Sequence, residues 1–356
     1  MHRSSKRSQP GFTMIELLIA TAITIVIIGG AVLMFTSSVQ SSTRSLKYSE
    51  IQTEARAALS QITRDLSQAG TGVPLNGIPV PSFVAGGLNP NFACDFNQCY
   101  TGQDIPFTQG LLYKVTPGNA IGPTISEPSD AIKVVYVDPT LNWSAFQAAT
   151  IAPNGGSLTM PVTTLPTPGD AAVGITPGDV LLLQNANGSA VGVVTSVGGF
   201  TITFGGDPLN INQLNAPSGN IRALGIPGSN PLSYPPTQVS RLTMITYFIQ
   251  PFVGPNGPDA RIMRQVGAHT PVPIAEHIED LKFTYDIVDP ITNALTANSL
   301  NAVIGAPPVS QPNQIRKVNI SVTARGVRRE ANGDFLRINL TTSIGPRNLS
   351  FRDRYN

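Results

Sequence analysis

A carboxylate stands at the start of a long apolar segment near the beginning of the chain. Glu16 is followed by a run from Leu17 to Thr43 that contains no charged side chain. A lone carboxylate in a membrane costs roughly 2.5–3.5 kcal/mol or more if it is unpaired. We therefore expect a positive partner that arrives when another subunit docks. Cutting the chain between Gly11 and Phe12 would create one, the new α-amino group of Phe12. The alternative is a carboxylate at the membrane interface that is protonated or reaches the headgroups.

Two cysteines lie close together in the chain. Cys94 and Cys99 are separated by four residues and are the only cysteines present. One such pair fits an export compartment, where a disulfide can lock a small loop. The alternative is two free thiols in a cytosolic protein. The spacing does not match the C-x-x-C pattern of redox and zinc sites.

The remaining residues with chemical potential form no familiar constellation. His269 and His277 have no cysteine or second histidine at metal-ligand spacing, so a zinc site is not expected. Asp95, Asn97 and Asp334 are predicted to cap turns; calcium binding is the alternative, although the D-x-[DN]-x-[DN]-G pattern is missing. Neither a phosphate-binding G-x-x-x-x-G-K-[ST] motif nor a G-x-S-x-G nucleophile motif occurs. We expect no catalytic, cofactor or metal site, and no enzymatic activity.

The positive charge of the chain is concentrated at its beginning. The net charge is +2, and the first eleven residues contain Arg3, Lys6 and Arg7 without any acid. The remainder is nearly neutral, so it lacks the basic stripe that nucleic-acid binding requires, and a nucleic-acid partner is not expected. Six arginines gather near a predicted hairpin end and at the carboxyl end, where we expect solvation, with DNA contact as the alternative: Arg325, Arg328, Arg329, Arg347, Arg352 and Arg354.

The apolar segment that carries Glu16 is long enough to span a membrane. The nineteen residues from Leu17 to Phe35 form a helix of about 28 Å, which matches the hydrocarbon thickness of a bilayer. The run is too long for a cleaved signal peptide and is not followed by an A-x-A site. Basic residues precede it and none follows at once, which places the amino end in the cytoplasm. We assign 12–36 to this membrane half of a helix.

The helix is predicted to continue as an amphipathic half over 37–69. Arg56, Arg64 and Asp65 are predicted to lie off its apolar stripe, and Gly70 and Gly72 signal the end of the helix. We expect the stripe to cover a sheet of the same protein. It consists of Ile51, Ala55, Ala58, Leu59, Ile62, Leu66 and Ala69.

The rest of the chain is expected to be rich in loops and antiparallel strands. Over the whole chain, 33 glycines, 31 prolines and 12% of charged residues argue against a helical bundle, whereas 41% of hydrophobic residues can form a core. Proline and glycine recur over 70–130, which we predict to be a loop region. Strand patterns dominate 131–356, with a hairpin at Asn187-Gly188 and a closing hairpin in which Val318, Ile320 and Val322 face the core. The predicted fold class is α+β.

The segment Gly11-Phe12-Thr13-Met14-Ile15-Glu16-Leu17 resembles the class III signal of type IV prepilins and type II secretion pseudopilins. The resemblance implies that 1–11 is a leader, that prepilin peptidase cuts between Gly11 and Phe12, and that Phe12 is N-methylated. It implies that Glu16 is the docking carboxylate. It further implies a type IV pilin-like fold, in which the long helix packs on an antiparallel sheet with loop-rich insertions.

Three further segments resemble PilW-type minor pilins and J-type pseudopilins: EARAALSQITRDLSQAG at the predicted helix end, IEDLKFTYDI at 278–287 and GPRN at 345–348. The length of the chain favours the PilW-like family. The resemblance implies a minor pilin whose partners are other pilins, prepilin peptidase, inner-membrane lipid and the pilus assembly platform. It would be located in the inner membrane before assembly and in a periplasmic or cell-surface pilus afterwards. The alternatives are a J-like pseudopilin of type II secretion and a pilus-borne adhesin or DNA-binding subunit.

Overall fold

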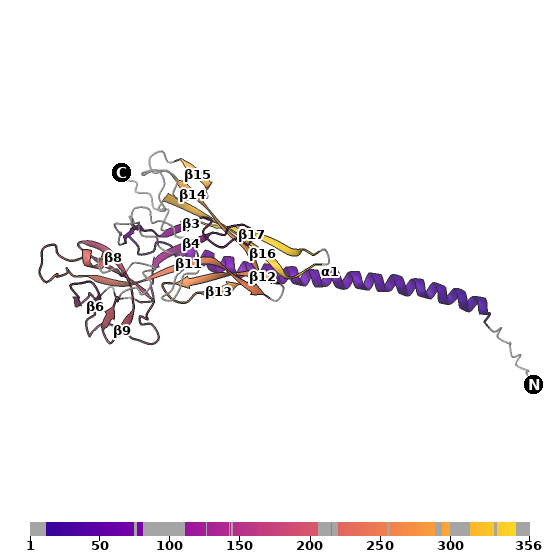
Figure 1. Cartoon of the computed structure of the whole chain (residues 1–356), viewed down its shortest axis with the longest axis horizontal. Coiled ribbons are helices and arrows are strands. Elements are labelled where there is room, and N and C mark those ends of the chain that lie inside the picture. Colours follow the sequence, from indigo (N-terminus) through magenta and orange to yellow (C-terminus); the bar gives the residue numbers. More distant parts are fainter. Residues whose placement is uncertain are drawn as a thin grey trace, which may run out of the picture. The chain divides into compact units, whose positions relative to one another are not determined.

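The computed structural model describes residues 12–74, 77–80, 111–125, 127–141, 143, 145–205, 215, 220–254, 257–288, 294–299, 314–330 and 333–346. One long helix, α1 (Met14–Gln68), is followed mainly by antiparallel strands (Figure 1). The chain therefore has the predicted α+β layout. It divides into two compact units, residues 1–50 and 51–356, and each is described by itself.

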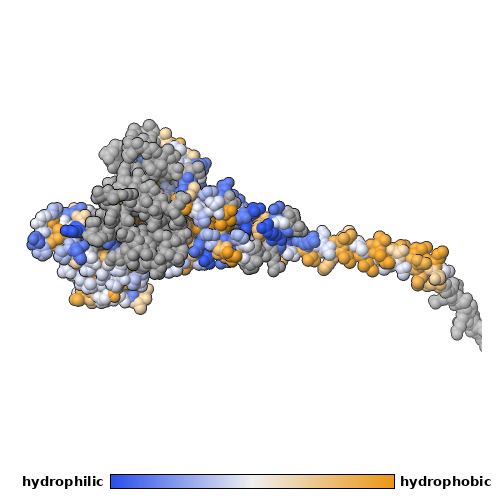
Figure 2. Space-filling view, viewed as in Figure 1, coloured by the Kyte–Doolittle hydropathy of each residue, from blue (hydrophilic) through white to orange (hydrophobic). Residues whose placement is uncertain are grey.

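In the first unit, α1 presents an apolar and uncovered surface. Its most apolar window of 18 residues has a mean hydropathy of 2.6, and none of that window is buried. Figure 2 shows this part of the helix in the orange of hydrophobic residues. By length and composition, α1 is the one helix among the described residues that is suited to cross a membrane. Such a surface is unfavourable in water and is stabilised by lipid or by other apolar helices.

In the second unit, α1 packs through the predicted apolar stripe. All seven predicted members, from Ile51 to Ala69, are buried, which confirms the pattern. They share one core with apolar residues of the main sheet and of the sheet that the closing strands form. Gly70 follows with a positive φ of 81°, a conformation that glycine adopts without steric cost, and its amide donates to the Val135 carbonyl at 2.8 Å. The helix therefore ends where its chain turns onto the sheet.

The main sheet is antiparallel and has the strand order β13-β12-β11-β4-β3, with β7 paired to β11 and β8 to β7. The predicted hairpin at Asn187-Gly188 is confirmed, because Asn185 pairs with Gly188 across its turn. The strands are β3 (Val115–Gly118), β4 (Ala131–Val137), β7 (Val180–Asn185), β8 (Gly188–Val193), β11 (Gln238–Gly254), β12 (Gly257–Val266) and β13 (Val272–Ala275).

The range 70–130 differs in part from the predicted loop region. It contributes β3 to the main sheet, and it contains a short antiparallel pair of β1 (Ile78–Pro79) and β2 (Leu111–Leu112). Pro117 lies within β3, which is an edge strand, where a missing N–H can face away from the ladder. A proline-bearing segment is therefore compatible with this sheet position, which the loop prediction did not allow for.

A third sheet is formed by an insertion. Val137 of β4 pairs with Leu242 of β11, so the residues between them, 138–237, are inserted between two paired strands. The insertion contributes β7 and β8 to the main sheet and has a separate apolar core that includes Trp143 and Phe204. It also contains β5 (Thr150–Ile151), β6 (Ser157–Thr159), β9 (Ser196–Gly198), β10 (Thr201–Thr203) and the short helix α2 (Asn220–Ala223).

The closing strands form a four-stranded antiparallel sheet with the order β15-β14-β16-β17. The predicted closing hairpin is confirmed, because Val322 lies opposite Leu340, and the inward residues Val318, Ile320 and Val322 are buried. The strands are β14 (Ile278–Val288), β15 (Leu295–Ser299), β16 (Ile315–Arg329) and β17 (Phe335–Ile344).

Asp65 lies on the buried side of α1, which corrects the prediction that it lies off the stripe. It follows Ile62 by three residues and precedes Ala69 by four, so it shares their face of the helix. Its Oδ2 accepts hydrogen bonds from the Tyr247 hydroxyl at 2.5 Å and from Arg264 Nε at 2.8 Å. Burial and the adjacent charge of Asp65 raise the pKa of Tyr247, so the phenol remains a neutral donor. This ion pair and hydrogen bond attach the helix to β11 and β12.

We predict that Asp65→Ala lowers the free energy of unfolding by about 3–5 kcal/mol, because it leaves Arg264 partly buried without its counter-charge. Chemical denaturation of the protein in detergent measures the change. Arg64→Ala, at the exposed neighbouring position, is the matched control and should stay within about 0.5 kcal/mol of the wild type. Equal losses for the two variants would contradict the assignment of a buried ion pair.

Candidate functional site

The first turn of α1 is closed by reciprocal hydrogen bonds between Thr13 and Glu16. The Glu16 amide donates to Thr13 Oγ1 at 3.3 Å, while the Thr13 amide and the Thr13 hydroxyl each donate to Glu16 Oε2 at 3.0 Å. This arrangement is a capping box, which satisfies amides that have no partner within the helix. Glu16 also lies at the positive end of the helix dipole, where a carboxylate is favoured.

The capping box leaves part of the Glu16 carboxylate available. Both hydrogen bonds reach Oε2, and no described residue of this chain donates to Oε1. A carboxylate that uses one oxygen internally can accept a charge-assisted bond from a second, cationic group at the other. Phe12, immediately before the box, is 86% exposed. Phe12 and the available Glu16 carboxylate therefore lie within the same turn of the chain.

The other predicted site residues can be placed only in part. Gly11, on the leader side of the predicted cleavage position, lies outside the described residues, and so do Cys94 and Cys99. The cleavage, methylation and disulfide assignments therefore stay predictions. Asp95 and Asn97 also lie outside the described residues.

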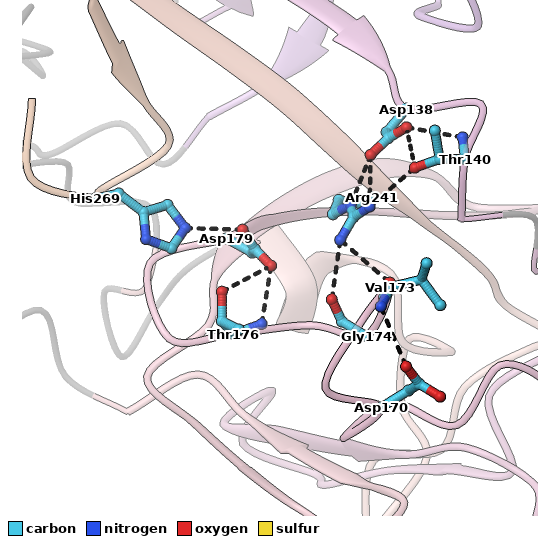
Figure 3. A network of polar contacts seen from close by, with 9 residues as sticks. All are labelled: Asp138, Thr140, Asp170, Val173, Gly174, Thr176, Asp179, Arg241 and His269. Atoms are coloured by element: carbon cyan, nitrogen blue, oxygen red, sulfur yellow. Dashed lines mark hydrogen bonds and ion pairs between the residues drawn. The ribbon is translucent and has the colours of Figure 1, made fainter. Parts of the chain in front are cut away.

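A second group of polar residues lines a cleft of about 420 Å³ in the second unit. In this cleft, Arg241 binds Asp138 through Nε at 2.8 Å and through Nη2 at 2.7 Å (Figure 3). Its Nη2 also donates to Thr140 Oγ1 at 3.1 Å, and its Nη1 donates to the Gly174 carbonyl at 2.9 Å. Arg241 therefore joins the end of β4, the start of β11 and the segment before β7.

Hydrogen bonds lower the pKa of two carboxylates in this cleft. Burial alone would raise the pKa of Asp138, but the bonds from Thr140 and Arg241 hold that pKa below its usual value. Asp179 shows the same balance: burial opposes ionisation, and bonds from His269 at 2.8 Å and from the Thr176 amide at 2.9 Å lower its pKa. Both groups are therefore stable as anions at neutral pH.

The acids of the cleft pair with basic side chains of the same chain. Asp65 pairs with Arg264, Asp138 with Arg241 and Asp179 with His269. Closed pairs of this kind hold chain segments together. The cleft is therefore a structural junction.

Sequence reasoning missed both Asp65 and Arg241. The signal for Asp65 was its helical spacing from Ile62 and Ala69, which outweighs its charge as an indicator of burial. Arg241 carried no comparable signal, because its partner Asp138 is 103 residues away in the chain. Contacts between residues so far apart in the chain form only when β4 and β11 pair in the sheet.

The two histidines and two of the hairpin arginines make contacts within the chain. His277 Nδ1 lies 2.5 Å from Asp259 Oδ2, and no cluster of three or more potential metal-binding side chains occurs in the described ranges. Arg325 was expected to be solvated at a hairpin end, but it is buried, pairs with Asp259 at 3.2 Å and stacks on Phe335 at 4.3 Å. Arg329 stacks on the same ring at 4.5 Å.

For the remaining arginines of that cluster, solvation stays a prediction. The side chain of Arg328 is outside the described residues, as are Arg347, Arg352 and Arg354. The prediction of solvation is therefore wrong for Arg325, whose position on β16 directs it to the acids of β12 and β14.

We predict that Arg241→Met lowers stability by about 2–3 kcal/mol, because it removes hydrogen bonds to a charged, part-buried partner. Hydrogen exchange should show faster exchange at the amides of Gly174 and Ile175. The pKa of Asp138 is lowered in the folded protein, so its stabilising effect is lost as the pH falls. The difference in stability between Arg241→Met and the wild type should therefore shrink towards pH 3. Arg222→Met, an exposed change in the same insertion, is the control. Unchanged exchange in Arg241→Met would count against the proposed junction.

Comparison with known proteins identifies the amino-terminal segment. Residues 6–32 match the family described as the prokaryotic N-terminal methylation motif. This range contains Gly11, Phe12 and Glu16 and covers a small part of the chain. No curated protein and no solved structure matched the chain in the same comparisons. With its apolar helix, the motif supports a prepilin-type protein, either type IV pilin-like or a pseudopilin, that is anchored in the membrane before assembly.

Proposed function

We propose that the protein is a PilW-like minor pilin, a structural subunit that adopts a type IV pilin-like fold and is incorporated into a type IV pilus. The observation that carries this proposal is the uncovered apolar half of α1, which has a single carboxylate in its first turn. Other partners would be the major and minor pilins and the assembly platform. The role is assembly, without enzymatic activity.

The mechanism follows from the two environments available to the apolar helix half. Moving it from lipid into a bundle of similar helices changes hydrophobic burial little, since lipid tails are as apolar as the side chains. Ion pairs and hydrogen bonds are therefore the interactions that favour one arrangement of helices over another. Glu16 of one subunit would bind the cationic amine of Phe12 of the next.

The membrane orientation of the precursor belongs to the same proposal. Basic residues at the beginning of the chain would keep the amino end in the cytoplasm, and the second unit would lie in the periplasm. Prepilin peptidase would then cut between Gly11 and Phe12 and methylate the new terminus. After assembly, the second unit would be displayed on a periplasmic or cell-surface pilus.

A type II secretion pseudopilin is the second candidate, because the matched methylation motif is compatible with both classes. Deleting the gene distinguishes them. Loss of pili with normal release of secreted proteins supports the minor pilin, whereas the reverse result supports the pseudopilin.

We predict that the protein purified from its native membrane begins at Phe12 and carries an N-methyl group. Intact-mass and amino-terminal peptide mass spectrometry measure this directly. Gly11→Val should retain the leader, because a side chain at the cleavage position obstructs the peptidase. Recovery of wild-type protein that starts at Met1, with normal filaments, would refute the proposed processing.

We predict that Glu16→Ala inserts normally in the membrane but is incorporated into pili at least about tenfold less, because a charge-assisted hydrogen bond is lost. Immunoblots of membranes and of sheared pili measure the two steps. Thr13→Val is the matched control, since it removes the side-chain part of the capping box and keeps the carboxylate. If both variants lose incorporation equally, helix capping would explain the defect and the docking role would be rejected.

A further inference from the structure

Over Ile338–Ile344, the outer edge of β17 lacks the charges, prolines and bulges that usually prevent a sheet edge from pairing. Among the described strands β17 pairs only with β16, at the end of the strand order. Its segment Ile338–Ile344 contains neither a charged residue nor a proline. This segment pairs with β16 in a continuous register, and the irregularity in the ladder lies beyond it, between Arg325 and Arg329. A regular, uncharged edge offers its backbone N–H and C=O groups to another strand.

The other described edge strands of the main sheet and of the closing four-stranded sheet are shorter than β17. One of them is β8, which has six residues and contacts α2 and β1. β3 and β13 are four residues long and contain Pro117 and Pro273, respectively. β15 has five residues and a register shift in its pairing with β14. Short length, proline and bulges are established ways of blocking edge pairing. Among these edge strands, β17 is the longest, with ten residues.

The edge of β17 opens onto a groove that it shares with the second half of α1. The groove has a volume of about 760 Å³. Leu59 and Leu340 provide apolar surface, while Thr341 and Thr342 provide the strand side. Arg56 and Arg64 line the groove from the helix, and its lining contains no carboxylate. The groove is therefore positively charged beside an available strand edge.

The spacing of the two arginines fits an extended ligand. Arg56 and Arg64 are eight residues apart on a helix, which corresponds to about 12 Å along its axis. Residues i and i+4 of a β-strand lie on the same face and are separated by about 13 Å. Carboxylates at those positions of one strand can therefore reach both guanidinium groups while the backbone pairs with β17.

We infer that the groove between β17 and α1 binds an extended, acidic segment of another subunit by strand addition to β17. Backbone hydrogen bonds to the edge supply affinity, and Arg56 and Arg64 select carboxylates. The identity of the partner as a subunit rests on the proposed function, whereas the chemistry of the site rests on the groove alone. The inference adds a contact in the second unit to the helix packing of the first.

The test uses full-length mature protein in detergent and a labelled peptide, acetyl-Thr-Glu-Val-Thr-Ile-Glu-Thr-amide, with fluorescence anisotropy as the readout. Replacing both glutamates with glutamine should weaken binding, and raising the salt concentration should do the same. A peptide with proline at its central position keeps both charges but cannot form a continuous strand, and it should not bind. Arg56→Gln and Arg64→Gln should each weaken binding by about two- to fivefold.

Two adjacent changes on β17 provide the matched pair. Thr342→Asp places a carboxylate in the groove and should abolish binding, whereas Ser343→Asp, at an exposed position outside the groove lining, should leave it unchanged. Equal binding of the proline peptide, or unaltered binding by Thr342→Asp, would overturn strand addition. Absence of any peptide binding would also overturn it. Because the assay needs no pilus, these results are independent of whether Glu16 directs incorporation.

Discussion

An apolar helix surface cannot remain in water, and this constraint governs how the first unit can be used. None of the most apolar window of this helix half is buried among the described residues, so lipid or other helices must cover it. These two environments are similar in hydrophobicity. Under the proposed function, a single polar contact decides which neighbour and which register are adopted, and Glu16 would make it.

The state of Glu16 in the isolated chain bears on that contact. Its hydrogen bonds with Thr13 hold the carboxylate at the helix start and occupy one of its two oxygens. Under the proposed function, docking to an incoming amine would thus add a bond at the other oxygen and leave the capping box intact. Because both interactions favour the ionised carboxylate, they support each other.

In the second unit, the same helix is held by a different kind of interaction. Seven apolar side chains form a common core with two sheets, and the Asp65 ion pair with Arg264 gives this packing a defined partner on β12. Apolar packing alone allows the helix to shift along the sheet, whereas a buried carboxylate is stable only where hydrogen-bond donors lie beside it. The Arg241 junction works similarly for the insertion, since it fixes the Gly174 carbonyl against β11 and the end of β4. Ion pairs between distant segments thus determine how the loop-rich parts are attached.

The sequence by itself determined the elements whose signals are local. Periodicity and turn chemistry act over a few residues. They predict the apolar run, the apolar stripe from Ile51 to Ala69, and the hairpins at Asn187-Gly188 and β16–β17. The motif around Gly11, Phe12 and Glu16 was likewise readable, because its meaning depends on fixed spacing. The burial of Asp65 could have been derived from the same periodicity, but its charge obscured it.

Only the tertiary structure decided which distant residues meet. Arg241 and Asp138, or Arg325 and Asp259, are brought together by strand pairing across long insertions, and no local pattern encodes such contacts. The strand β3 within a proline-rich range and the open edge of β17 depend in the same way on the order of strands in the sheets. The physical reason is that strand order and ion pairing are set by the fit of whole surfaces, whereas helices and turns are set by neighbouring residues.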